Sequence, residues 1–140
     1  MVGVIPAAGR GMRAYPSTKY IPKVMFEVNG KPIIQRNVEL MRDKLGIRHI
    51  YVILGYSGDM IKSHLKDGSE FGVKITYLKN DRIDEGLTRS IQVAKEYVTS
   101  PFVVLLGDEV YVNTNHEQIL TMLNQDFNVI CAVKETDRPE

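Results

Sequence analysis

The chain has 140 residues, 44% hydrophobic and 25% charged, with a formal net charge of +1. These values are ordinary for one globular domain, residues 1–140, and the near-neutral charge argues against a protein that coats nucleic acid or binds membrane surfaces. No apolar run approaches the roughly 20 residues of a membrane span, and no cationic segment precedes the first apolar run as in a signal peptide. We expect the single cysteine, Cys131, to be a buried core residue, which agrees with the cytoplasmic location that we expect.

Apolar runs alternate with segments of helical periodicity along the chain. In chain order, we expect a strand at Val2–Ile5, a β-prone piece at Val24–Val28, a helix at Pro32–Leu45, a strand at His49–Leu54, a helix at Asp59–Lys66, a strand at Val73–Leu78, a polar loop at Lys79–Glu85, a helix at Gly86–Val98, a strand at Phe102–Leu106, a helix from Asn115 to Leu123 or Asn124, and a strand at Phe127–Val133. The helix at Gly86–Val98 is expected to face inward with Leu87, Ile91, Ala94 and Val98.

Nearly continuous apolar strands separated by helices predict an α/β fold. We expect three layers, with a mostly parallel Rossmann-like sheet covered by helices on both faces. In such sheets ligands bind at the carboxyl ends of the strands. The segment Pro6–Lys23 and the residue Asp108 both follow predicted strands, so both belong to that edge.

The segment Pro6–Lys23 (PAAGRGMRAYPSTKYIPK) combines two glycines with four cations, and no acidic residue occurs before Glu27. Glycines let backbone N–H groups approach phosphate oxygens closely, while Arg and Lys neutralise their charge. The local charge of this segment is +4, although the whole chain carries only +1. This concentration of positive charge predicts a polyphosphate site.

The two common glycine-rich nucleotide motifs do not fit this loop. Gly9, Gly11 and Ala14 fit a dinucleotide fingerprint formally, but Pro16 and Pro22 break the helix that it requires. The dinucleotide fingerprint also expects an acidic residue at the end of the strand His49–Leu54, and none is present there. The residue spacing of a P-loop is absent. Two interpretations remain. The segment is either a long irregular loop that wraps a nucleoside triphosphate or an ordinary surface loop with chance cations.

Three motifs resemble those of the sugar-1-phosphate nucleotidylyltransferases. That family's signature runs roughly (L/P)-A-(G/A)-G-x-G-x-R-x-x-P-x-T-x-x-x-P-K, followed by K-P-x-I. This chain supplies Ala7, Gly9, Gly11, Arg13, Pro16, Thr18, Pro22 and Lys23, and then Lys31-Pro32-Ile33-Ile34. Gly86-Leu87 resembles the family's base-contact turn, and Leu106-Gly107-Asp108 resembles its L-G-D metal motif. The resemblance covers essentially the whole chain but only the first part of the family's domain, which implies a truncated domain of the nucleotide-diphospho-sugar transferase type, without the sugar site and the second acidic metal ligand.

The resemblance implies a nucleotidyltransferase that joins a nucleoside monophosphate, from UTP or dTTP, to a sugar 1-phosphate and releases pyrophosphate. It implies Arg13 and Lys23 as catalytic cations and Asp108 as the ligand of Mg²⁺, a hard cation that prefers carboxylates and phosphate oxygens. The residues expected to contact the nucleotide are Ala7, Ala8, Gly9, Arg10, Gly11, Met12, Asn80, Gly86 and Leu87. The implied partners are the triphosphate and the sugar phosphate, with neither nucleic acid nor membrane. An uncovered sheet edge would favour a homo-oligomer.

Some residues depart from the family pattern. Met12 stands where threonine is common, and Thr88 and Arg89 replace small or amide residues. The glutamine that reads a pyrimidine edge is not evident, and Asn80 or Asp81 lies nearest to its place. Base choice therefore stays open, as do two alternatives: a cytidylyl- or guanylyltransferase acting on another phosphorylated acceptor, and a non-catalytic nucleotide-binding half-domain.

Overall fold

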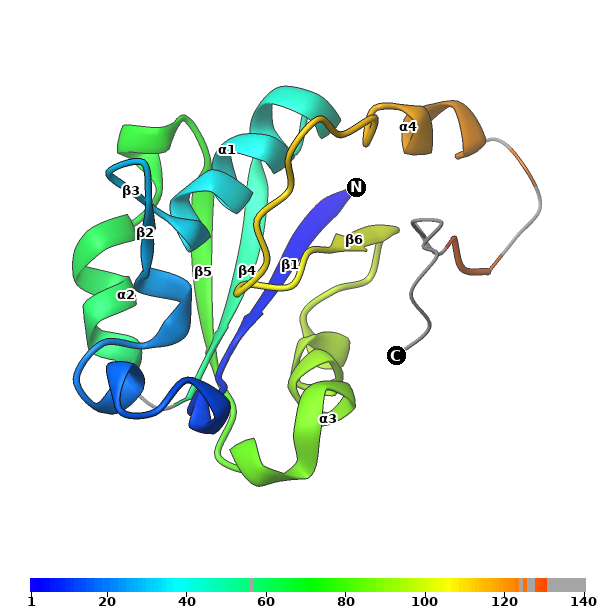
Figure 1. Cartoon of the computed structure of the whole chain (residues 1–140). Helices are drawn as coiled ribbons and strands as arrows, with labels where there is room; N and C mark the ends of the chain where they lie inside the picture. The colour runs from blue at the N-terminus through cyan, green and yellow to red at the C-terminus, as the bar shows by residue number, and fades with distance from the viewer. Residues whose placement is uncertain (56, 124, 126–127, 131–140) are drawn as a thin grey trace, which may run out of the picture.

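The computed structural model describes residues 1–55, 57–123, 125 and 128–130. Four parallel strands form its sheet, in the order β5-β4-β1-β6. They are β1 (Val2–Ala7), β4 (His49–Leu54), β5 (Lys74–Lys79) and β6 (Phe102–Val104). Two further strands, β2 (Glu27–Val28) and β3 (Lys31–Pro32), form a separate antiparallel hairpin (Figure 1).

Helices connect the strands. The α-helices are α1 (Ile33–Leu45), α2 (Gly58–Leu65), α3 (Gly86–Val93) and α4 (Gln118–Met122). Short 3₁₀ helices occur at η1 (Met12–Ala14), η2 (Ser17–Lys19), η3 (Lys23–Met25), η4 (Ser69–Phe71), η5 (Ile83–Glu85) and η6 (Ala94–Glu96). No helix in the described ranges is long and apolar enough to cross a membrane.

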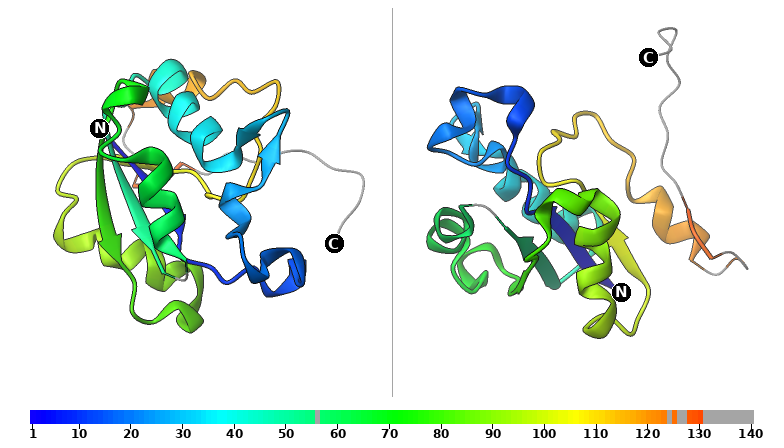
Figure 2. Two further views of the ribbon diagram at one scale, coloured as in Figure 1. Left: turned by 90° about the vertical axis from the view of Figure 1, so that its left-hand side faces the viewer. Right: turned by 90° about the horizontal axis from the view of Figure 1, so that it is seen from below.

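The sheet lies between two helical layers, as predicted (Figures 1 and 2). Side chains alternate between the faces of a strand, so each strand contributes to two cores. Ile5 and Val52, which are opposite each other in β1 and β4, pack in the core that contains α1 and α2. Val4 and Ile53 pack on the other face with Ala94, at the end of α3. This arrangement explains why the strands are nearly continuously apolar.

Helix α1 forms because an apolar stripe recurs along it at helical spacing. Ile34, Val38 and Met41 are fully buried on this stripe. Gly46 ends the helix in the left-handed conformation, at φ 64°, and its amide donates to the carbonyl of Met41.

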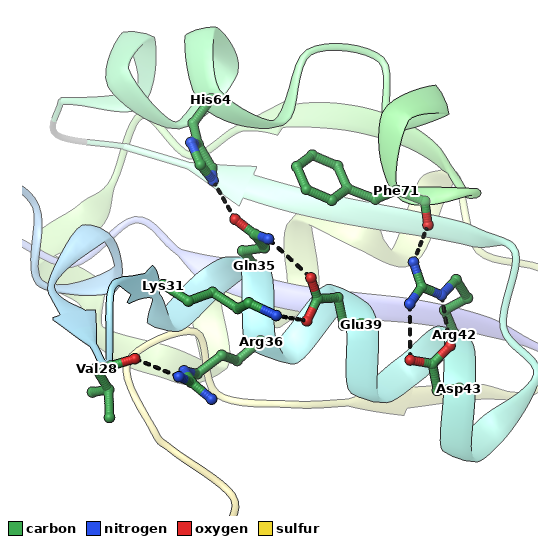
Figure 3. A network of polar contacts seen from close by, with 9 residues as sticks. All are labelled: Val28, Lys31, Gln35, Arg36, Glu39, Arg42, Asp43, His64 and Phe71. Carbon is green, nitrogen blue, oxygen red and sulfur yellow. Dashed lines mark hydrogen bonds and ion pairs between the residues drawn. The ribbon is translucent and has the colours of Figure 1, made fainter.

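The polar side of α1 joins neighbouring elements through a hydrogen-bond network (Figure 3). Glu39 accepts hydrogen bonds from Lys31 of β3 at 2.6 Å and from Gln35 at 2.9 Å. Gln35 also contacts the ring of His64, on α2, at 2.9 Å. Burial raises the pKa of Glu39, but the bonds from Lys31 and Gln35 outweigh it, and the pKa lies below its usual value. The network fixes the hairpin and α2 against the helix.

The structure corrects several expected boundaries. Val24–Val28 is a turn of 3₁₀ helix followed by a strand of two residues, because the amides of Met25 and Phe26 donate to the carbonyls of Pro22 and Lys23. The strand expected at Phe102–Leu106 ends at Val104.

Two expected helices also differ from the structure. The segment expected as a helix at Gly86–Val98 is α-helical only to Val93. Leu87 is 47% exposed, so the expectation that Leu87 faces inward is wrong. Its position in the first turn puts it on the cavity described below. The last helix begins at Gln118 instead of Asn115, whose side-chain amide donates to the Gln118 side chain at 2.8 Å.

The expected strand at Phe127–Val133 lies largely outside the described residues, as does Cys131. Its described part, residues 128–130, is not in a strand.

Candidate active site at the carboxyl edge of the sheet

A cavity of about 430 Å³ opens where the parallel strands end. Three segments line it: the loop after β1, the start of α3 with the residues before it, and the turn after β6. Nine residues predicted from the sequence meet here: Ala7, Ala8, Gly9, Gly11, Arg13, Lys23, Gly86, Leu87 and Asp108. Because these residues come from three distant parts of the chain, the parallel topology is what brings them together.

The loop after β1 is folded back on itself by Thr18. This threonine is buried, and its hydroxyl donates to the carbonyl of Gly11 at 2.9 Å. Gly11 has a φ of 65°, and a Cβ on it would lie 2.8 Å from the Thr18 methyl carbon. Gly9 differs, since a Cβ there would meet no atom within 4 Å. The backbone at Gly9 is therefore open toward the cavity, and a ligand can approach it closely.

A lysine and an aspartate meet across this cavity. The Lys23 ammonium lies 2.8 Å from Oδ2 of Asp108, and their side chains are 40% and 42% exposed. Arg13 lines the same cavity. The site thus holds two cations and a carboxylate within one concave surface.

Asp108 owes its position to the close approach of the segment after β6 to the end of β1. The amide of Gly107 donates to the carbonyl of Pro6 at 3.2 Å. A Cβ on Gly107 would lie 2.6 Å from that carbonyl oxygen, so the approach requires glycine. The segment after β6 therefore runs directly beside the end of β1 and carries Asp108 to the cavity that the loop after β1 also lines.

Three predicted nucleotide contacts do not line the cavity. Arg10 forms an exposed ion pair with Asp84 at 3.4 Å, and Met12 is 72% exposed. Asn80 is buried beneath α3, where its amide nitrogen donates to the hydroxyl of Ser90 at 3.0 Å. That amide supports the segment that precedes α3, and its contact with a nucleotide stays a prediction.

The structure also adds cavity residues that sequence reasoning passed over. These are Pro6, Val24, Ile83, Ser90, Leu106 and Glu109. Most are neighbours of the motifs and carry no chemical signal of their own. Glu109 follows the Leu106-Gly107-Asp108 motif directly, borders the cavity and accepts a hydrogen bond from the Tyr111 hydroxyl at 2.9 Å.

Tyr111 remains protonated at ordinary pH. Burial, followed by the hydrogen bond to Glu109, raises the pKa of its hydroxyl to about 12. It therefore serves as a stable donor to the Glu109 carboxylate.

Within the described part of the chain, no group of three or more His, Cys, Asp or Glu side chains could hold a metal ion. A second cavity, of about 370 Å³, lies beside α1 and residues 111–114, and none of the predicted site residues lines it.

The fold and this cavity define an α/β protein with a parallel sheet and a glycine-rich cationic loop opposite an acidic turn. The family model described as nucleotidyl transferase matches residues 2–140, and the chain belongs to this family. The resemblance drawn from the motifs is thereby confirmed.

Two relatives are about one-third identical to this chain over the aligned residues. It is 33% identical over its full length to the UTP–glucose-1-phosphate uridylyltransferase AglF of Haloferax volcanii, of which it covers 56%. It is 32% identical to the bifunctional protein GlmU of Methanococcus aeolicus over 99% of its own length and 31% of that protein. The chain thus spans between about a third and about half of these relatives.

Solved structures agree with the fold. A Bacillus anthracis protein described as a glucose-1-phosphate thymidylyltransferase matches 90% of this chain and 51% of its own, at a TM-score of 0.80 and 31% identity. A UDP-glucose pyrophosphorylase in complex with UDP-glucose matches 87% of this chain and 53% of its own, at a TM-score of 0.73 and 25% identity. The predicted Rossmann-like sheet is confirmed.

Proposed function

We propose that this chain is the triphosphate-binding part of a sugar-1-phosphate nucleotidylyltransferase. The observation that supports this most directly is the meeting of Lys23 and Asp108, at 2.8 Å, in a cavity bordered by the glycine-rich loop. A polyphosphate needs open backbone amides, positive charge and a carboxylate that can share a cation with it. Gly9, Arg13 and Asp108 supply one of each on the same surface.

In the proposed reaction an oxygen of the sugar 1-phosphate attacks the α-phosphorus of the triphosphate. The new oxygen–phosphorus bond forms while the bond to the β-phosphate breaks, and pyrophosphate leaves with that electron pair. The attacking oxygen is already anionic, so no general base is needed. Catalysis is then mainly positioning and charge neutralisation between two polyanions.

The side chains of the cavity divide this task. Lys23 lies where it can bridge the α-phosphate and the incoming sugar phosphate. Arg13 stabilises the charge that develops on the departing pyrophosphate. The amides near Gly9 and Gly11 hold the triphosphate in line, because only a backbone without a side chain allows such close approach.

The residues of the acidic turn fit Mg²⁺, which prefers one or two carboxylates together with phosphate oxygens. Lys23 engages only Oδ2 of Asp108, and the described residues offer no hydrogen bond to its other oxygen. The carboxylate of Glu109 is adjacent, although Tyr111 donates to it. When bound, Mg²⁺ would contribute further positive charge against the triphosphate.

The nucleotide is proposed to be UTP or dTTP, and the acceptor glucose 1-phosphate or a close analogue. Uridylyl and thymidylyl transfer to glucose 1-phosphate are the activities named for two of the relatives described above. Ile83 and Leu87 border the cavity as apolar side chains against which a base can pack.

A thermal-shift panel of UTP, dTTP, CTP, ATP and GTP, with and without Mg²⁺, tests this proposal. A triphosphate at about 100 times its Kd should add about 2.7 kcal/mol to the free energy of unfolding. We expect UTP or dTTP to give the largest shift, and Mg²⁺ to increase it.

An absence of any shift would contradict nucleotide binding by this chain. Preference for CTP or GTP would favour transfer to a different phosphorylated acceptor. Pyrophosphate release on addition of glucose 1-phosphate would show that the chain turns over, whereas binding without release would assign it the triphosphate half alone.

A further inference from the structure

Asn37 is a polar residue on the buried stripe of α1. It is only 1% exposed and lies next to the fully buried Val38. Its amide nitrogen donates to the carbonyl of Leu106 at 3.0 Å, while its amide oxygen is buried and finds no partner among the described residues. A buried amide that leaves an acceptor unused is unfavourable for folding. Stability alone therefore does not account for an asparagine at this core position.

The carbonyl that Asn37 holds belongs to the turn that carries Asp108. The amides on either side of Leu106 each donate to β1 carbonyls at 3.2 Å. Because backbone groups alternate in direction along an extended chain, the N–H and C=O of Leu106 point away from β1. Asn37 takes the carbonyl, and the Tyr111 hydroxyl accepts the N–H at 3.2 Å. Two side chains thus replace the missing sheet partner just before Asp108.

Tyr111 extends this support beyond Asp108. Its hydroxyl donates to the carboxylate of Glu109 at 2.9 Å while accepting from the Leu106 amide. Leu106 and Glu109, which flank the Gly107-Asp108 pair, therefore both hydrogen-bond to the Tyr111 hydroxyl.

We propose that Asn37 and Tyr111 are positioning residues that fix where Asp108 presents its carboxylate to a metal-bound triphosphate. Neither needs to touch the nucleotide, and both act through the backbone and through Glu109. The inference rests on the proposed function, since it requires a metal ion at Asp108. Residues that orient a metal ligand in this way typically change metal affinity by about 10- to 100-fold when they are removed.

Two variants test the proposal, Asn37→Leu and Tyr111→Phe. Leucine removes the donor but also the unpartnered amide oxygen, and phenylalanine keeps the ring that packs against His116. Tyr77→Phe is the matched control, because the Tyr77 hydroxyl donates to a backbone carbonyl, that of Lys66, at 2.6 Å and does not border the cavity.

The primary measurement is the affinity for Mn²⁺, as a spectroscopic substitute for Mg²⁺, in the presence of saturating UTP or dTTP. We expect Asn37→Leu and Tyr111→Phe each to weaken it by about tenfold or more. The affinity for the triphosphate in EDTA should be unchanged, and the melting temperature should move by no more than about 4 °C. Tyr77→Phe should alter neither affinity.

Equal loss of metal-dependent and metal-free binding in both variants would mean a general structural role and overturn the positioning assignment. Unchanged Mn²⁺ affinity in Tyr111→Phe would also overturn the positioning assignment. If Asn37→Leu does not fold, the Mn²⁺ affinity of Tyr111→Phe tests the proposal alone. If the unmodified chain binds no triphosphate at all, the proposed function fails, and this inference fails with it. If the unmodified chain binds triphosphate with a metal requirement that both variants retain, only this inference fails.

Discussion

Lys23 and Asp108 are 85 positions apart in the sequence, and their charged atoms lie 2.8 Å apart across the cavity. In the proposed function, Lys23 binds a phosphate group of the substrate, and Asp108 binds the metal ion that accompanies it. Without substrate they neutralise one another. Both side chains are about two-fifths exposed, so this pair contributes only about 0–1 kcal/mol and opens readily.

Replacing the lysine should therefore have opposite effects on the two ligands. In Lys23→Met, we expect triphosphate binding to weaken by about 1.5–3 kcal/mol, the value of a hydrogen bond to a charged group. Binding of Mn²⁺ alone should strengthen by up to about fivefold, because Asp108 no longer has a competing cation. Isothermal titration of each ligand separately measures both effects.

Lys19→Met is the control for that variant. Lys19 is a cation of the same loop, stands over the Tyr20 ring at 5.1 Å from its centroid, and does not border the cavity. Weaker binding of both ligands to Lys23→Met would contradict the competition between Lys23 and the metal ion for Asp108.

Arg13 and Arg10 provide a second comparison within the loop. Arg13 borders the cavity, whereas Arg10 pairs with Asp84 outside it. We expect Arg13→Gln to weaken triphosphate binding by about 1.5–3 kcal/mol, and Arg10→Gln by about 1 kcal/mol or less. Neither should change the melting temperature appreciably. Equal losses in titrations of the two variants would mean that the loop attracts the triphosphate only through its net charge.

Substitutions at Gly9 and Gly107 should affect triphosphate binding and folding stability differently. Gly9 lies outside the left-handed region and has open space at its Cβ position, so Gly9→Ala should leave stability unchanged or raise it by up to about 1 kcal/mol. Binding of the triphosphate should nevertheless fall, because the methyl group would occupy the space that a phosphate needs.

Gly107→Ala, in contrast, should lower the free energy of unfolding. Its Cβ would lie 2.6 Å from the Pro6 carbonyl, so we expect a loss of about 1–3 kcal/mol in the free energy of unfolding. Denaturant titrations and triphosphate titrations of both variants make the comparison. Undiminished binding by Gly9→Ala would exclude close phosphate approach at that residue.

Stability should also depend on pH through His49. Burial, and then the charge of Lys74, lowers the pKa of His49 below its ordinary value of 6.5. The unfolded chain therefore takes up a proton at higher pH than the folded chain does, and the free energy of unfolding falls as the pH drops below about 6.5. His116, whose pKa burial also lowers, acts in the same direction.

His49→Gln should reduce this acid destabilisation, since glutamine does not titrate but can still hydrogen-bond with Thr76, which now contacts the ring at 2.9 Å. Adding His116→Gln should reduce it further. Denaturant titrations at about pH 7.5 and about pH 5.5 bracket the ordinary histidine pKa. An unchanged difference between the two pH values in the double variant would assign the effect to other groups.

The sheet could be predicted from the sequence alone, and the polyphosphate site stays a prediction from it. The bounds predicted for His49–Leu54 are those of β4, because a strand buried on both faces must be apolar throughout. Parallel strands separated by helices direct every loop after a strand to one edge, so the loop after β1 and Asp108 could be assigned there from their order alone. The glycines and cations of that loop were enough to indicate a polyphosphate.

Which side chains line the cavity could be seen only in the folded structure. Arg10 and Arg13 are both cations of the same loop, yet Arg13 borders the cavity whereas Arg10 pairs with Asp84 outside it. Leu87 follows a helical pattern that predicts burial, but it lies on the cavity wall. Asn37 lies 69 positions before Leu106 in the sequence, and it meets the acidic turn only because α1 packs against the sheet. Side-chain direction in loops and first helical turns depends on contacts between distant segments, and no local pattern records those contacts.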